Sequence, residues 1–238
     1  MEFLISKYFL LMQLIFFAVI ALFFLNLKGI RSLHKGIFKE NKIIFLILFF
    51  GLSLRIWFVP HIHHVYFDEF EDIDIGQNLS RGDGFQVTLK GSPENCEAGS
   101  LPARPPGYNA ILAMAFFLLG ASEQVAYGVN IFLGTISILL VFLIAALLFA
   151  DKKIASWSAF LFSVLPVHLK YSGSAATEIT SSFFVLLLLW AGLLYLKKQE
   201  FSILLLFIFT SIATLYMRPE NLIFYIGAII FILIMNFH

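Results

Sequence analysis

The sequence has very few of the residues that build covalent or metal-thiolate frameworks. Cys96 is the one cysteine among 238 residues, which excludes a disulfide within the chain and a metal site made of several cysteines. Charged residues make up only 13% of the chain, and the formal net charge at pH 7 is +1. A protein of this composition has no excess of basic groups to replace the counterions of nucleic acid, so we expect no nucleic-acid partner.

Apolar residues are abundant where charge is scarce. They form 60% of the sequence, with 29 phenylalanines, and the mean hydropathy is +0.91. A soluble domain of this length does not carry so apolar a composition. Because helices satisfy their own backbone hydrogen bonds inside lipid, the composition predicts an all-α integral membrane protein.

Seven apolar runs are candidate membrane spans, since roughly 30 Å of hydrocarbon takes about 20 helical residues to cross. They cover residues 8–27, 43–59, 124–150, 153–169, 177–196, 201–217 and 221–237. An eighth run, residues 107–120, would reach only about 21 Å as a helix. Pro105 and Pro106 come directly before it, as is typical of a helix start. We therefore expect seven transmembrane helices and one interfacial helix.

The distribution of lysine and arginine predicts the orientation, because short loops rich in these residues prefer the cytoplasmic side. The loop between the first two spans carries Lys28, Arg31, Lys35, Lys39 and Lys42. The acidic segment that follows the second span is then expected on the extracytoplasmic side. An interfacial helix, which does not cross, also keeps the lysine pairs near residues 152 and 197 on the cytoplasmic side.

Two parts of the chain follow from this topology. Residues 1–42 form an additional transmembrane helix with its basic cytoplasmic loop, and residues 43–238 form a transmembrane module whose first exterior loop, residues 60–123, is large. We expect an integral protein of a prokaryotic plasma membrane or of the endoplasmic reticulum.

Three loops bring polar residues to the expected outer rim. Arg218 in "YMRPEN" opposes the orientation rule, so it either reaches toward water or meets a ligand or partner. Glu178 begins an otherwise apolar helix, where a ligand contact or the helix N-terminus could stabilise the carboxylate. Both residues are candidates for substrate binding.

The segment "DEFEDIDIGQNLS" of the large loop has apolar residues among its carboxylates, which predicts an amphipathic surface helix. Glu71, Asp72 and Asp74 fit a solvated acidic face of that helix. Asp68 differs because it directly follows the aromatic-rich segment of residues 57–67, at the expected surface of the membrane. A carboxylate at that place could accept the proton of an incoming hydroxyl.

Histidines next to these carboxylates raise the alternative of a divalent metal. His61, His63 and His64 precede Asp68 and Glu69, and His168 could add a ligand from another loop. These residue types bind metals, but their spacing matches no metal motif. Interfacial histidines without a metal remain the other interpretation, and we expect no required cofactor.

Four segments in order, "YFDEFEDIDIGQNLSRGDGF", "PARPPGYNAILAMAFFLLG", "LPVHLKYSGSAATE" and "LYMRPENL", resemble the GT-C membrane glycosyltransferases. The resemblance is specifically to the superfamily of dolichyl-phosphate-mannose protein mannosyltransferases and aminoarabinose transferases, over roughly residues 43–237. It implies transfer of a sugar from a polyprenyl-phosphate carrier to a protein or lipid acceptor, by one inverting displacement on the extracytoplasmic face.

The resemblance also implies roles for individual residues. Asp68 matches the loop acid that serves as general base, and Glu69 matches its catalytic neighbour. The substrate-binding positions it implies are Arg104, Tyr108, Glu178, Arg218 and Glu220.

Relatives have more spans than the seven counted here, so the chain is either a piece of a longer enzyme or a reduced one. A catalytically silent module that binds lipid phosphate, completed by a partner subunit, is therefore an alternative. A transporter or flippase is less favoured, because the expected spans carry their charges at the rims.

Overall fold

The computed structural model describes residues 2–30, 42–88 and 104–236. Within these ranges the regular structure is helical and contains no strand. The helices are α1 (Glu2–Leu25), α3 (Ile43–Ser53), the π-helical turn η1 (Leu54–Phe58), α4 (Tyr66–Arg81), α5 (Pro106–Leu119), α6 (Glu123–Phe149), α7 (Lys152–Ser163), α8 (Pro166–Ser172), α9 (Thr177–Lys198), α10 (Phe201–Met217), the 3-10 turn η2 (Pro219–Asn221) and α11 (Leu222–Asn236).

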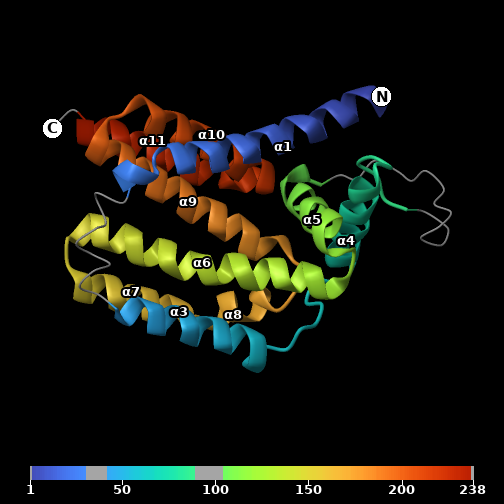
Figure 1. Ribbon diagram of the computed structural model, residues 1–238, viewed down its shortest axis with the longest axis horizontal. Helices are drawn as coiled ribbons and strands as arrows, with labels where there is room; N and C mark the ends of the chain where they lie inside the picture. The colour runs from blue at the N-terminus through green and yellow to red at the C-terminus, as the bar shows by residue number, and fades with distance from the viewer. Residues whose placement is uncertain (1, 31–41, 89–103, 237–238) are drawn as a thin grey trace.

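Two long helices form the middle of the bundle. α6 and α9, with 27 and 22 residues, are each long and apolar enough to cross a membrane. In Figure 1, α1, α10 and α11 lie on one side of this pair, and α3 and α7 lie on the other. Apart from α1, which has 24 residues, the other apolar helices among the described residues are shorter, with 10–17 residues. The expectation of an all-helical fold is confirmed for the described residues, whereas the count of seven spans and the loop topology stay predictions.

One expected span is not a single helix. The prediction of a continuous helix over residues 153–169 is wrong, because α7 ends at Ser163 and α8 begins at Pro166. Leu165, between them, has an extended backbone, with φ −62° and ψ 115°. Proline has no backbone N–H and disfavours a helical conformation in the residue before it, so the chain breaks here and restarts with Pro166 in the first turn of α8.

α4 and α5 pack against each other across one end of the bundle (Figure 1). Ile75 and Leu79 of α4 are buried with Ala113 of α5. Gly107 lets α5 approach α10 closely, since an added Cβ there would lie 2.6 Å from the backbone oxygen of Tyr216. Both helices of the large loop were expected, and their packing fixes where the loop's charges lie.

The two ends of the bundle differ in charge. The polar end, as we name it here, holds α4, α5, the first turns of α6 and α9, and the last turn of α10 (Figure 1). The basic end, opposite to it, holds the first turns of α3 and α7 and the last turn of α9, with Lys42, Lys152 and Lys198.

Candidate functional site

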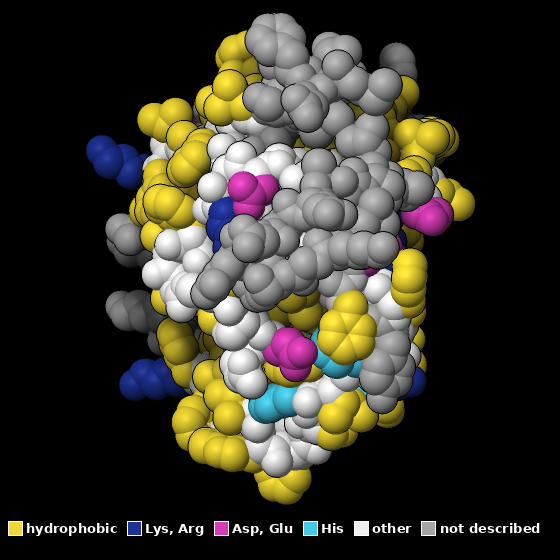
Figure 2. All heavy atoms as spheres, turned by 90° about the vertical axis from the view of Figure 1, so that its right-hand side faces the viewer, with side chains coloured by type: hydrophobic (Ala, Val, Ile, Leu, Met, Phe, Trp, Pro, Cys, Tyr) yellow, Lys and Arg dark blue, Asp and Glu magenta, His cyan; other side chains and the backbone are white. Residues whose placement is uncertain are grey.

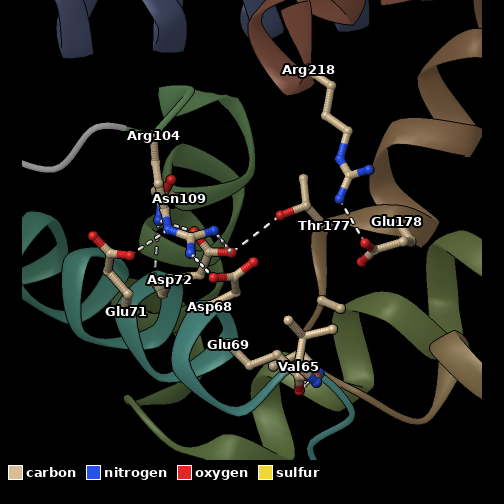
Figure 3. Close-up of polar contacts among 12 residues, drawn as sticks. Val65, Asp68, Glu69, Glu71, Asp72, Arg104, Asn109, Thr177, Glu178 and Arg218 are labelled. Carbon is tan, nitrogen blue, oxygen red and sulfur yellow. Dashed lines mark hydrogen bonds and ion pairs between the residues drawn. The ribbon is translucent and has the colours of Figure 1, made fainter. Parts of the chain in front are cut away.

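Arg104 gathers three carboxylates of α4 at the polar end. Its Nη2 forms a short ion pair with Asp68 Oδ1, its Nε lies 2.5 Å from Glu71 Oε2, and its Nη1 lies 3.9 Å from Asp72 Oδ2. Residues three and four apart share one face of a helix, so α4 presents these carboxylates together. Figure 3 shows the guanidinium group among them.

Asp72 links this cluster to two other helices. Its side chain accepts hydrogen bonds from Asn109 Nδ2 at 3.0 Å and from Thr177 Oγ1 at 3.1 Å. The residue is only 3% exposed, and this burial raises the pKa of Asp72 to about 6, although Arg104, Asn109 and Thr177 oppose the shift.

The prediction that Glu71, Asp72 and Asp74 form a solvated face is therefore wrong. Asp72 is buried, the side chain of Glu71 is 16% exposed, and Asp74 accepts a hydrogen bond from the backbone N–H of Thr88 at 2.6 Å. The physical reason is that α4 packs against α5, which begins directly after Arg104 and Pro105, so the carboxylates of α4 face Arg104 and the protein interior.

Glu69 lies in the interior, with no exposed surface. Its Oε1 accepts hydrogen bonds from the backbone N–H groups of His64 at 2.7 Å and Val65 at 2.9 Å. Its Oε2 accepts from the N–H of Ala175 at 2.9 Å and lies 2.9 Å from Nδ1 of His63. These four contacts tie the start of α4 to the segment between α8 and α9. Glu69 thus fixes the position of its neighbour Asp68.

Glu178 and Arg218 form a second charged group beside the first. Arg218 Nη2 lies 2.6 Å from Glu178 Oε1, and the two side chains are 41% and 30% exposed. Glu178 belongs to the first turn of α9, directly after the Thr177 that contacts Asp72. Figure 3 shows Thr177 between the two groups, so α9 brings segments that are distant in sequence to one place.

Two other predicted substrate-binding residues lie differently. Tyr108 is 1% exposed in a core with Met217, and its hydroxyl has no hydrogen-bond partner in the described part of the chain. Glu220 is exposed in η2. Tyr108 therefore contributes to packing in this conformation, whereas Glu220 is accessible to a ligand.

The histidines do not gather around a common point. His63 lies between Glu69 and the Tyr127 hydroxyl, at 2.9 and 3.2 Å, while His61 contacts the backbone oxygen of Arg55 at 3.1 Å. His168 faces the guanidinium of Arg55, which repels cations. Among residues 2–30, 42–88 and 104–236, no three or more His, Cys, Asp or Glu side chains are arranged to hold a metal ion. The space-filling view of the polar end shows histidine and acidic side chains among hydrophobic ones (Figure 2).

The sequence analysis missed Arg55, which is fully buried in η1. Its Nη1 donates to the backbone oxygens of Gly51 at 2.8 Å and Ser163 at 3.4 Å, and its Nη2 lies 3.1 Å from Nδ1 of His168. Its Nε has no partner among the described residues. An arginine inside the apolar run 43–59 was the available signal, since a charge in a span is rarely without a specific environment.

A comparison with protein families identifies the family of this chain. The sequence model of the dolichyl-phosphate-mannose-protein mannosyltransferase family matches residues 103–238, which include Arg104, Glu178 and Arg218 but begin after Asp68. Neither a curated protein nor a solved structure matches the chain. Because the family match covers more than half of the sequence, the chain belongs to the dolichyl-phosphate-mannose-protein mannosyltransferase family, whose members are membrane glycosyltransferases of the GT-C type.

Proposed function

We propose that this chain transfers a sugar from a polyprenyl-phosphate carrier to a hydroxyl of an acceptor, on the extracytoplasmic face of the membrane. One observation carries the proposal: Asp68, Arg104, Glu178 and Arg218, from separate segments, lie together at the polar end (Figure 3). Acid and guanidinium groups at one site are what a displacement at a sugar phosphate requires.

Asp68 is the proposed general base. Half of its side chain is exposed, while its Oδ1 is held by Arg104. Its Oδ2 has no partner among the described residues and is therefore available to the acceptor hydroxyl. The acceptor oxygen attacks the anomeric carbon as Asp68 takes its proton, and the bond from that carbon to the phosphate oxygen breaks. The electron pair leaves with the lipid phosphate, so the anomeric configuration inverts.

Arg218 is better suited than Arg104 to meet the donor phosphate. Arg104 already neutralises part of the charge of three carboxylates, and these would repel an anionic donor. Arg218 pairs with one carboxylate and is the more exposed of the two guanidinium groups. We therefore assign Arg218 to the phosphate and Arg104 to the orientation of Asp68.

The donor class follows from the expected orientation. Loops rich in lysine are expected in the cytoplasm, where nucleotide sugars are kept, so a site at the polar end needs a sugar carried across by lipid. The family description agrees with a dolichyl-phosphate-mannose donor and a protein acceptor, and we propose these classes for this chain. No step uses a metal ion, so a chelator is expected to leave transfer unchanged.

The test compares Asp68→Asn with Asp83→Asn, a matched loss of one exposed carboxylate from the same segment. Purified chain is given polyprenyl-phosphate-mannose and a peptide acceptor, and the released polyprenyl phosphate is measured. Because general bases contribute about 10²–10⁴-fold, Asp68→Asn is expected to lose at least about 100-fold in turnover, while Asp83→Asn keeps it. Equal turnover of Asp68→Asn and wild type would overturn the assignment.

A second comparison separates the two arginines. Arg218→Ala is expected mainly to raise the KM for the donor, and Arg104→Ala mainly to lower kcat. The reverse pattern would exchange their roles. Donor binding without turnover by the wild-type chain would instead support the silent lipid-phosphate-binding module, completed by a partner subunit.

A further inference from the structure

Thr177 lies between the two charged groups of the candidate site (Figure 3). On one side, its hydroxyl contacts Asp72, which belongs to the group around Arg104. On the other side, its chain neighbour Glu178 is the partner of Arg218. In an inverting displacement the attacking and leaving oxygens stand on opposite faces of the anomeric carbon. A donor bound as proposed therefore has its sugar between the two charged groups, next to Thr177.

The backbone that presents Thr177 is held in place before any ligand binds. The fully buried Asn130 of α6 donates from Nδ2 to the backbone oxygen of Ala176 at 2.8 Å. The backbone N–H of Ala175 donates to the carboxylate of Glu69 at 2.9 Å. Thr177 follows as the first residue of α9, and it is partly exposed where Ala175 and Ala176 are buried. Because a β-branched side chain has few χ1 rotamers in a helix, its hydroxyl has a defined position.

The hydroxyl of Thr177 can donate to Asp72 and still accept from a ligand. Its Oγ1 lies 3.1 Å from Oδ2 of Asp72, and an ionised carboxylate only accepts hydrogen bonds, so the hydroxyl proton points to Asp72. Burial raises the pKa of Asp72 to about 6, which leaves this carboxyl mostly ionised at pH 7. Within the described part of the chain, no group donates a hydrogen bond to Oγ1 of Thr177. Its lone pairs are therefore open to a donor, and the contact with the carboxylate strengthens them as acceptors.

We propose that Thr177 accepts a hydrogen bond from the hydroxyl on C2 of the donor sugar and thereby helps to select that sugar. C2 is bonded to the anomeric carbon, so its hydroxyl is the sugar hydroxyl nearest the reacting bond. The ring oxygen, also bonded to the anomeric carbon, has no proton to donate. Hydrogen bonds to the hydroxyl on C2 strengthen in the transition state of glycosyl transfer to water. The inference rests on the proposed function, because it takes the positions of the base and of the phosphate from Asp68 and Arg218.

The experiment gives the purified full chain two donors, polyprenyl-phosphate-mannose and its 2-deoxy analogue, and measures kcat/KM for each with a peptide acceptor. The two donors differ in intrinsic reactivity, but this difference cancels when the ratio of their kcat/KM values is compared between variants. Thr177→Val removes the hydroxyl and keeps the β-branched shape. The ratio of mannose to 2-deoxymannose is expected to fall by about 2–12-fold in this variant, the range for one net hydrogen bond. A purely structural role would lower both values alike and leave the ratio unchanged.

Two control variants complete the comparison. Thr177→Ser keeps a hydroxyl at the same place and is expected to keep the wild-type ratio. Thr135→Val removes a hydroxyl in the middle of α6, where it donates to the backbone oxygen of Ile131 at 2.8 Å, and is also expected to keep the ratio.

Three outcomes would count against the inference. An unchanged ratio in Thr177→Val, or an equal fall in Thr135→Val, would overturn it while leaving the proposed function in place, since the wild type still transfers mannose. A wild-type chain that transfers neither donor would contradict the proposed function itself, and the role of Thr177 with it.

Discussion

Glu69→Gln tests whether the buried carboxylate of Glu69 positions the site or takes part in the chemistry. Both oxygens of Glu69 receive hydrogen bonds, from the backbone N–H groups of His64, Val65 and Ala175, with His63 beside them. A glutamine can accept at one oxygen only, so its amide N–H₂ must face at least one buried N–H donor. A buried donor without a partner costs about 1–3 kcal/mol, and bonds to a charged acceptor exceed neutral ones by about 1 kcal/mol each.

These contributions together predict a loss of about 3 kcal/mol in the free energy of unfolding. For a chain of this size that corresponds to a fall of roughly 6–12 °C in Tm. The measurement is thermal unfolding of the detergent-solubilised variant, followed by the transfer assay at a temperature where it is folded. Because Asp68 is retained, we expect kcat to fall while activity remains measurable.

Glu71→Gln is the matched control for this experiment. It removes one carboxylate from the same helix, but Glu71 contacts Arg104, which keeps Asp68 and Asp72 as partners. The expected loss is about 1 kcal/mol. A Glu69→Gln variant that unfolds at the wild-type temperature would refute the positioning role. Full stability combined with abolished turnover would instead assign the chemistry to Glu69.

Three further predictions concern packing and charge. Gly107→Ala pushes a Cβ against Tyr216, so it should lower the free energy of unfolding by about 1–3 kcal/mol, and the Tm with it. At Gly128 an added Cβ has no atom within 4 Å to meet, so Gly128→Ala should raise the free energy of unfolding by up to about 1 kcal/mol. Equal Tm values for the two variants would contradict this reasoning. The pKa of Asp72 is raised to about 6 by burial, so the folded state binds the proton more tightly than the unfolded state, and this carboxyl lowers stability as the pH rises from about 4 to 6. Asp72→Asn should therefore raise Tm relative to wild type more at pH 7 than at pH 4, and a constant difference would argue against the shift. Arg55→Met removes a buried cation that contacts no carboxylate among the described residues and should leave Tm unchanged or raise it; a large fall in Tm would show that its hydrogen bonds outweigh its desolvation.

Much of the helical architecture could be predicted from the order of residues. The runs at 124–150, 177–196 and 201–217 correspond closely to α6, α9 and α10, because helix length follows directly from the length of an apolar run between polar caps. The short run at 107–120 also became a helix too short to cross upright, α5. Pro166 was itself a local signal that a helix should break before it. The high hydropathy of residues 153–169 concealed that signal when they were interpreted as one span.

The sequence also identified the residue types of the candidate site, since charge is rare in this chain and its position at the ends of apolar runs is informative. Asp68, Glu178 and Arg218 were singled out in this way, whereas Arg104 was implied by the family resemblance. The structure brings all four to one end of the bundle. Which of them pair could not be read from the sequence, because pairing depends on how α4, α5 and α9 pack.

The sequence by itself determined that the chain is a helical membrane protein with an acidic loop, because composition and the length of apolar runs are local properties. Only the tertiary structure decided that Glu69 and Asp72 turn inward, and that Arg104 meets three carboxylates while Arg218 meets one. Neighbouring carboxylates in α4 look alike in sequence. Their different surroundings arise from backbone donors and side chains more than 30 residues away, such as Ala175, Asn109 and Thr177, which a local pattern cannot specify.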